Sequence, residues 1–317
     1  MSLGWHRWAS GTRRLAWTGL VLCVAGPISR METPSVQAVE AVPVETATAK
    51  TDTAQPVAAE VLFGKDNLVA WCIVPFDALK RGPEARAEML VRLGLRHVAY
   101  DWREEHVASF EEEILAYKKH GLDYFAFWDV HPQAFELFRK HQLHPQIWKM
   151  IPAPQGETQE AKVESAARQL LPLVKETRDL GCPLSLYNHG GWMGEPRNMV
   201  AVCRWLREHE DASHVGIVYN FHHGHDHIGA FPQLLAEMLP YLHCLNINGM
   251  NDGAQPKILG VGKGQHDKAM LQAVLDSDYR GRIGILDHRE NLDAEESLRE
   301  NLEGLAKLLA DLRTQLP

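Results

Sequence analysis

Eight short apolar runs, each followed by a segment with helical spacing of apolar residues, constrain the fold of this chain most strongly. The runs have the length of buried strands and cover residues 68–74, 95–100, 123–128, 145–151, 183–188, 214–220, 242–248 and 282–287. The helical patterns cover residues 83–93, 106–117, 132–141, 158–180, 196–209, 229–239, 266–275 and 293–313. Continuous apolar strands that alternate with helices are typical of a parallel sheet covered by helices. Eight such units predict an α/β fold of the (β/α)₈ TIM-barrel type.

The composition agrees with one large globular domain, because 45% of the residues are hydrophobic and 23% are charged. An open, doubly wound sheet is the alternative topology. No GxGxxG motif follows the first apolar run, which disfavours the dinucleotide-binding form of that fold. The formal net charge is -8 and no block rich in Lys and Arg occurs within the domain. Binding of nucleic acid through a basic face is therefore not expected.

The N-terminal part of the chain differs from the rest. Residues 1–30 combine a basic start with an apolar run at 15–25, which predicts a signal peptide or an N-terminal anchor. That run is short for a membrane span, so no stable insertion beyond the leader is expected. Residues 31–63 are rich in Ala, Val, Thr, Glu and Pro and predict a disordered linker. This organisation leaves residues 64–317 for the barrel and predicts export to the periplasm or the cell exterior.

The cysteines show no pattern of a metal or disulfide framework. None of them forms a CxxC pair, and they stand at Cys23, Cys72, Cys182, Cys203 and Cys244. A zinc–cysteine site and a disulfide-rich scaffold are therefore not expected. We expect the four cysteines within the domain to be small, buried apolar residues.

Four histidines crowd into six residues directly after the sixth apolar run. The stretch from Val215 reads VGIVYNFHHGHDH and contains His222, His223, His225 and His227. Chemistry in barrel folds occurs at the C-terminal ends of the strands, and imidazoles bind metals and transfer protons near neutral pH. A solvated polar loop is the other interpretation of this cluster. The two histidines furthest along the loop fit solvated or capping positions best.

Polar and aromatic residues also follow the other apolar runs. Tryptophan faces pack on the C–H faces of sugars, and amides form hydrogen bonds with hydroxyls, so these strand ends favour a sugar site. The predicted sugar-binding residues are Trp128, Trp148, Lys149, Asn188, Trp192, Asn248, Lys263 and His288. Lys263 lies in the glycine-rich stretch 260–264, which fits either an anion-binding loop or an ordinary flexible loop.

The last four strands end in a series of polar residues, which are Asn188, Asn220, His223, Asn246 and Asp287. Over residues 67–313 this series resembles the metal-ligand positions of the xylose isomerase-like TIM-barrel superfamily, which contains sugar isomerases, epimerases and endonuclease IV-type enzymes. The resemblance implies a divalent metal such as Mn, Zn, Mg or Fe. It also implies proton transfer between adjacent carbons of a sugar through an enediolate.

The chain resembles a divergent member, because asparagine replaces three of the four principal ligands. A neutral amide oxygen is a poor substitute for a carboxylate toward a divalent cation. The metal ligands that the resemblance and the histidine cluster imply are Asn220, His222, His223, Asn246 and Asp287. A different site made from His189, His222, His223 and Asp287 is a second possibility, and a metal-free site with histidine acid–base groups is a third. The predicted catalytic residues are Asp287, His223 and His189.

The main functional prediction is an exported sugar isomerase or epimerase that moves a proton on a sugar or keto-sugar, or a lyase that acts on a keto-sugar. A non-catalytic sugar-binding barrel without its metal site is the alternative that the asparagines motivate. A phosphoesterase of the endonuclease branch is least favoured, because the chain lacks that branch's His- and Glu-rich ligands and is acidic. The expected partner is a small carbohydrate and no nucleic acid.

Overall fold

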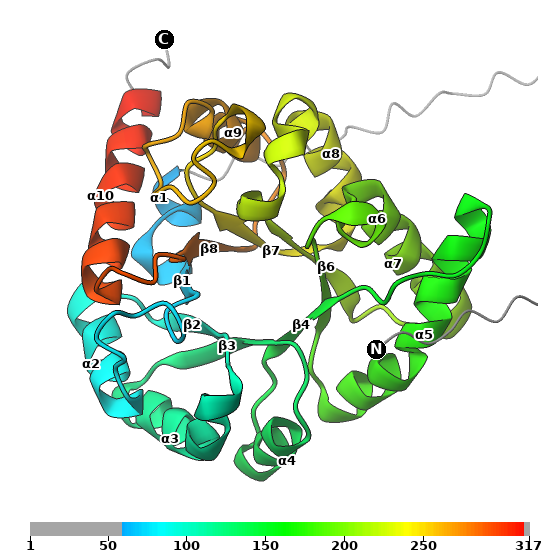
Figure 1. Cartoon of the computed structure of the whole chain (residues 1–317), viewed down its shortest axis with the longest axis horizontal. Coiled ribbons are helices and arrows are strands. Elements are labelled where there is room, and N and C mark those ends of the chain that lie inside the picture. Colours follow the sequence, from blue (N-terminus) through cyan, green and yellow to red (C-terminus); the bar gives the residue numbers. More distant parts are fainter. Residues whose placement is uncertain (1–58, 314–317) are drawn as a thin grey trace, which may run out of the picture. The chain divides into compact units, whose positions relative to one another are not determined.

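The computed structural model describes residues 59–313, which form a closed barrel of eight parallel strands (Figure 1). The strands pair in chain order, and β8 pairs with β1 to close the ring. Their bounds are β1 Leu68–Trp71, β2 His97–Tyr100, β3 Asp123–Trp128, β4 Gln146–Met150, β5 Leu184–Tyr187, β6 Val215–Asn220, β7 Leu242–Ile247 and β8 Arg282–Leu286. The TIM-barrel prediction is therefore confirmed, and the open sheet is excluded.

Helices surround the barrel between successive strands (Figure 1). Their bounds are α1 Ala59–Leu62, α2 Pro83–Leu93, α3 Phe110–His120, α4 Pro132–His141, α5 Gln159–Leu180, α6 Gly191–Gly194, α7 Pro196–Glu210, α8 Phe231–Met238, α9 Asp267–Leu275 and α10 Ala294–Arg313. The helix predicted at 106–117 begins later, because a 3₁₀ turn at Glu104–Ser109 precedes α3. The short helices α1 and α6 were not predicted, since four residues are too few to show a helical period.

Side chains alternate along each strand between the inside of the barrel and the helices. The inner set consists of residues of the strands, together with Cys72 and Phe76 from the segment after β1, and its members are Val69, Trp71, Cys72, Phe76, Ala99, Ala126, Trp148, Tyr187, Val218, Cys244 and Leu286. Trp71 and Trp148 meet edge to face inside the barrel, with ring centroids 4.7 Å apart. This alternation decides which residues beyond each strand reach the mouth of the barrel.

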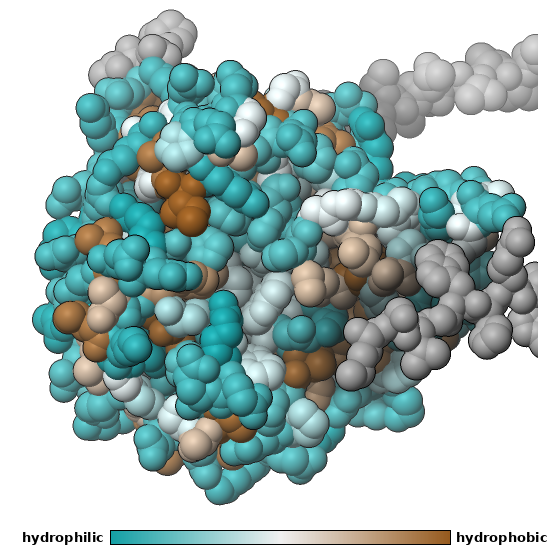
Figure 2. Space-filling view, in the orientation of Figure 1, coloured by the Kyte–Doolittle hydropathy of each residue, from teal (hydrophilic) through white to brown (hydrophobic). Residues whose placement is uncertain are grey.

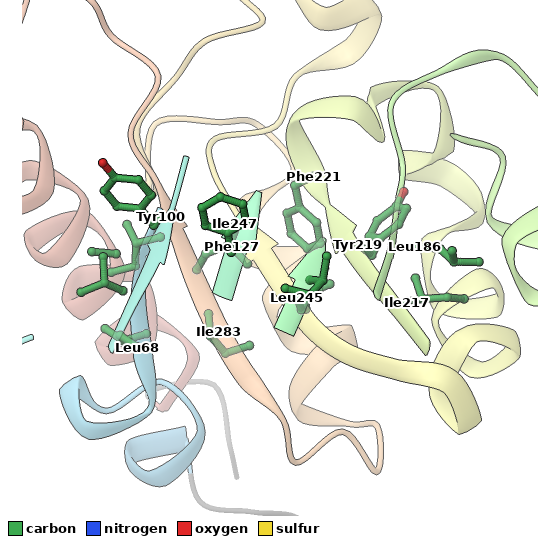
Figure 3. Close-up of a cluster of buried hydrophobic side chains, with 14 of the residues drawn as sticks. Leu68, Tyr100, Phe127, Leu186, Ile217, Tyr219, Phe221, Leu245, Ile247 and Ile283 are labelled. Carbon is green, nitrogen blue, oxygen red and sulfur yellow. The ribbon is translucent and has the colours of Figure 1, made fainter. Parts of the chain in front are cut away.

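The outer side chains form the main hydrophobic core between the strands and the helices (Figure 3). Phe221 meets Phe231 of α8 edge to face, with ring centroids 5.0 Å apart, and Tyr219 also stacks on Phe231. All three side chains are fully buried. Buried aromatic residues contribute large apolar areas to stability, so this layer fixes β6 and its histidine loop against α8.

The barrel unit begins before the predicted boundary at residue 64. Leu62 and Phe63 are only 2% and 3% exposed and pack in the main core, although the sequence predicts that residues 59–63 belong to the linker. The leader at 1–30 and the rest of the linker lie outside the described residues. The cysteines that the structure describes are buried and free, as expected. Within residues 59–313, no helix has the length and apolar character that a bilayer crossing requires.

Candidate active site

A cavity of about 100 Å³ lies at the C-terminal ends of the strands. It is lined by Trp71, Cys72, Phe76, Asp101, Arg103, Trp128, Tyr187, His189, Asn220, His222, His223, Leu286 and His288. These residues come from the ends of β1, β2, β3, β5, β6 and β8 or from the loops directly after them. This is the place where barrel enzymes carry their chemistry.

Four imidazoles form a row along one side of the cavity. The ring centroids are 4.3 Å apart for His189 and His223, 4.8 Å for His223 and His222, and 4.7 Å for His222 and His288. The Nδ1 atoms of His222 and His288 are buried and have no hydrogen-bond partner among the described residues. A buried polar atom without a partner is rare, so these two nitrogens are candidates for contact with a ligand or water.

Burial keeps His222, His223 and His288 neutral. It lowers the pKa of His222 to about 3 and the pKa of His223 to about 2, and the neighbouring histidines and Lys257 lower both further. Burial also lowers the pKa of His288, with Arg103 and Lys257 acting in the same direction. At neutral pH these three rings therefore hold no extra proton, and each offers one N–H donor and one acceptor nitrogen.

A buried carboxyl group lines the same cavity. Asp101 is 1% exposed, and its Oδ1 accepts a 3.4 Å hydrogen bond from the backbone N–H of Val74. Its Oδ2 is buried and has no partner among the described residues. Burial raises the pKa of Asp101 to about 7, although the positive charge of Arg103 opposes the shift. The group is thus close to half-protonated at neutral pH, as a general acid or base should be.

Aromatic rings form the inner wall of the cavity. The ring centroids of Trp128 and Tyr187 are 4.5 Å apart, and those of Trp71 and Trp128 are 6.0 Å apart. Asn220 donates a hydrogen bond from Nδ2 to the Tyr187 hydroxyl, and its Oδ1 accepts one from the N–H of His222 at 3.0 Å. The wall therefore combines apolar ring surface with a fixed amide and hydroxyl, which suits the two kinds of surface on a sugar.

The structure brings together only some of the residues predicted from the sequence. The predicted residues that line the cavity are Trp128, His189, Asn220, His222, His223 and His288. Those that do not line it are Trp148, Lys149, Asn188, Trp192, Asn246, Asn248, Lys263 and Asp287.

Asp287 and Asn188 fall on the outward side of the alternation. Asp287 follows the inward-facing Leu286, and its Oδ1 accepts a hydrogen bond from Ser297 of α10. Burial raises the pKa of Asp287 to about 7, as it does for Asp101, but the carboxyl group is outside the cavity lining. Asn188 follows the inward-facing Tyr187 and forms hydrogen bonds with the backbone of Asn220 at 2.7 and 2.9 Å.

Asn246 in β7 and Asn248 directly after it are buried but lie outside the cavity lining. Asn246 accepts a hydrogen bond at Oδ1 from the Cys244 thiol at 3.6 Å, and its Nδ2 has no partner among the described residues. Asn248 donates to the carbonyl of Gly249 at 2.8 Å. Neither amide therefore projects beside the histidine row.

The remaining predicted residues contact other parts of the protein. Trp148 lies inside the barrel and donates to Gln146 at 2.9 Å, and Trp192 donates to Gln159 at 2.9 Å. The ammonium group of Lys149 pairs with Asp129, and that of Lys263 pairs with Glu300.

The glycine-rich loop is also occupied by the protein itself. The carboxylate of Asp267 accepts hydrogen bonds from the backbone N–H groups of Met250, Gly262 and Gly264 at 2.6, 2.7 and 3.0 Å. An anion would need these same N–H groups. The loop is therefore a folded connection and not a free anion cradle.

Seven lining residues were absent from the predicted set, which are Trp71, Cys72, Phe76, Asp101, Arg103, Tyr187 and Leu286. The alternation along β2 was a usable signal for two of them. Ala99 faces the barrel interior, so Asp101 and Arg103, two and four residues later, continue on the inward side. Phe76 gave no comparable signal, because it lies in a loop.

The residues present do not fit the carboxylate-held metal of the superfamily. Asn188 is bonded to the Asn220 backbone, Asn246 is outside the lining, and Asp287 contacts α10. Across residues 59–313, the atoms of three possible ligands lie within 4.8 Å of one another only at Glu84, Glu88 and His120. That group is on the outer surface of α2 and α3, and Glu84 already pairs there with Lys119 and His120.

Comparison with known proteins supports the fold. No family model matches the sequence, and no curated protein matches it. The structure is similar to 3-keto-D-glucoside 4-epimerase YcjR from E. coli, with a TM-score of 0.55 and 15% identity over 77% of this chain and 99% of that chain. It is also similar to the IolI protein with a bound zinc atom, with a TM-score of 0.58 and 14% identity over 78% and 99% of the two chains.

A xylose isomerase domain protein from Alicyclobacillus acidocaldarius has a TM-score of 0.52 and 17% identity, with coverage of 78% of this chain and 99% of that one. The described chain thus shares its TIM-barrel fold with these proteins. At sequence identities this low, the structural similarity establishes only the fold. The chemistry has to be inferred from the residues that line the cavity.

Proposed function

We propose that this chain is a sugar isomerase or epimerase that transfers a proton at the carbon next to a carbonyl group of a sugar or keto-sugar. One observation carries the proposal: Asp101 and the pair His222 and His223 face one cavity from β2 and β6. In a closed ring of eight strands, β2 and β6 lie on opposite sides. A substrate held between them has a proton-transfer group on each face.

The protonation states of the two sides are complementary. Asp101, with a pKa raised to about 7, can take a carbon-bound proton when ionised and return one when protonated. His222 and His223 have pKa values too low to hold an extra proton at neutral pH, but a neutral imidazole can relay one, because one ring nitrogen takes a proton from water while the other gives its N–H proton to the other face of the sugar. Removal of a proton on one side and its return on the other inverts the carbon, which is the requirement of an epimerase.

The aromatic wall supports a carbohydrate substrate. The faces of Trp71, Trp128 and Tyr187 supply apolar area, while the Asn220 amide lies among them. The cavity of about 100 Å³ suits the reacting end of a sugar, with the remainder in the open mouth. The similar structure of 3-keto-D-glucoside 4-epimerase agrees with this substrate class.

The proposed proton transfer uses the chain's own residues. The asparagines at the ligand positions supply no carboxylate for Mn²⁺, Mg²⁺, Fe²⁺ or Zn²⁺, so no step is assigned to a cation held there. A keto-sugar lyase would begin with the same proton abstraction by Asp101 and then expel a leaving group from the next carbon.

Incubation with 3-keto-sugars in D₂O tests the proposal, with ¹H NMR to follow loss of the proton next to the carbonyl. We expect exchange with the wild type and a loss of about 10²-fold or more with Asp101→Asn, since general acid–base groups contribute factors of this size. Asp129→Asn is the matched control, because Asp129 directly follows β3 but does not line the cavity. An unsaturated product would indicate the lyase.

A wild type that binds keto-sugars without any exchange would contradict catalysis and favour a non-catalytic sugar-binding barrel. Exchange that persists undiminished in Asp101→Asn would remove Asp101 from the mechanism.

A further inference from the structure

Arg103 is a positive group of the cavity that the proton-transfer proposal does not use. Its guanidinium lines the cavity beside Phe76, with Cζ 5.7 Å from the centre of that ring. Its one hydrogen bond within the described chain runs from Nη1 to the carbonyl of Trp102 at 2.7 Å. No carboxylate among residues 59–313 lies within ion-pair distance of it, whereas most other arginines there have such a partner.

The other charged groups near the mouth do not balance this cation. Asp101 is the only carboxyl group in the lining, and its pKa of about 7 leaves much of it uncharged. Lys257, which is exposed, lowers the pKa values of His222, His223 and His288, so its charge lies close enough to act on the row. Exposed Glu290 acts on His288 in the opposite direction. A positive site thus lies on a chain whose formal net charge is -8.

The histidine row adds donors that a negative group could use. The Nδ1 atoms of His222 and His288 are buried and unpartnered within the described chain, and the His288 ring packs edge to face on Phe76, with centroids 4.1 Å apart. Arg103 packs on the same Phe76 ring. The guanidinium and the end of the histidine row are therefore joined through one aromatic side chain.

We propose that the sugar substrate is anionic and that Arg103, together with His288, binds its carboxylate or phosphate group. Arginine matches both groups with two parallel N–H donors, which gives orientation as well as affinity. The negative group would fix the sugar so that its reacting carbon lies between Asp101 and His222. The identification of the ligand as a sugar rests on the proposed function, whereas the preference for a negative charge rests on Arg103.

Titration calorimetry with D-glucuronate, D-glucose 6-phosphate and D-glucose tests the proposal on the full chain. We expect at least one anionic sugar to bind about tenfold or more tightly than glucose, which is the effect of one charge-assisted hydrogen bond. The comparison of the two anions distinguishes a carboxylate site from a phosphate site. Binding of glucose as tight as that of both anions, or no binding of either anion at millimolar concentration, would overturn the proposal.

The variants assign the effect to one residue. Arg103→Gln should abolish the preference for the anion, and Arg103→Lys should retain part of it, because lysine keeps the charge but not the fork. Arg96→Gln is the matched control, since Arg96 is exposed and precedes β2. An unchanged preference in Arg103→Gln would overturn the assignment. If Arg103→Gln fails to fold, the wild type decides, because its affinity for the anion must fall as NaCl screens the charge.

This proposal and the proposed function can fail separately. Deuterium exchange on neutral keto-sugars without a preference for anions would leave only the epimerase proposal standing. Tight binding of an anionic sugar without exchange would leave only the anion site standing.

Discussion

The side chain of Asn188 pairs with the backbone of Asn220, because its Oδ1 accepts the N–H at 2.7 Å and its Nδ2 donates to the carbonyl at 2.9 Å. The two residues stand at the ends of β5 and β6, so this side chain extends the hydrogen bonding of the two strands. Asn188 stands at a position that resembles that of a metal ligand, but in this structure its side chain connects two strands. Asn220 is thereby oriented with its amide toward Tyr187 in the cavity.

Replacement of Asn188 by alanine should lower the free energy of unfolding by about 2–4 kcal/mol, because a buried N–H and a buried carbonyl lose their partner. Urea unfolding measures this change. Asn188→Asp should also destabilise, since a carboxylate cannot donate to the Asn220 carbonyl. Asn291→Ala, at an exposed loop position, is the control and should change stability by less than about 0.5 kcal/mol. An Asn188→Ala protein as stable as this control would show that the paired amide is dispensable.

Asp101 should make the barrel less stable as the pH rises. Its folded pKa of about 7 lies above the ordinary value of 3.8, so between these values the folded state binds more protons than the unfolded state. The contribution of Asp101 to the free energy of unfolding is therefore largest below the ordinary pKa. It declines as the pH rises through the folded pKa. Asp287 acts in the same sense, and His222 and His223 act in the opposite sense below their ordinary pKa.

The comparison of wild type with Asp101→Asn isolates the effect of Asp101. In urea unfolding at pH 5, 6 and 7, the stability of the variant relative to wild type should rise with pH by at most about 1.4 kcal/mol per unit. A difference that stays constant over this range would mean that Asp101 titrates at an ordinary pKa.

Mg²⁺ and Mn²⁺ should leave the protein unaffected. Both ions prefer carboxylate oxygens, whereas three of the four strand ends that resemble the metal positions carry amides that already hold hydrogen bonds. The fourth carries Asp287, whose carboxylate accepts a hydrogen bond from Ser297. After dialysis against EDTA, addition of either ion should leave Tm unchanged, and elemental analysis should find less than one ion per chain. One firmly bound equivalent of Mn²⁺ with a raised Tm would contradict this reading of the asparagines.

Asp267 should be essential for the order of the glycine-rich loop. Asp267→Ala removes three hydrogen bonds from Met250, Gly262 and Gly264, so we expect a loss of about 2–5 kcal/mol in urea unfolding. Limited proteolysis should then cut between residues 249 and 265. The exposed Asp252 supplies the matched control, Asp252→Ala, which should stay resistant. Equal resistance of the two variants would argue that other contacts order the loop.

The sequence predicted the fold well because the signal is repeated. Every strand is a short apolar run, and the strand predicted at 123–128 has the observed bounds. The helix near 106 was displaced because its first residues form a 3₁₀ turn, which has no distinct pattern in the sequence. The hydrophobic interior also explains why the surface in Figure 2 is mainly hydrophilic, with apolar residues in small scattered groups.

The site was harder to predict because a shift of one position along a strand turns a side chain from the inside of the barrel to the outside. Asp287 and His288 are neighbours in sequence, but only His288 reaches the cavity. Likewise, His189 lines the cavity, whereas its neighbour Asn188 does not. Position at a strand end could therefore be read from the sequence, whereas side-chain direction required the last inward residue of each strand, such as Tyr187 or Leu286.

The Asn188 and Asn220 pair has a consequence for how the rim of the barrel is held together. In a barrel whose strand ends are held together by a bound cation, this contact forms only after the cation binds. Here the fifth and sixth strands are joined at the rim by groups of the chain itself. The contact between these two strands at the rim therefore needs no bound cation.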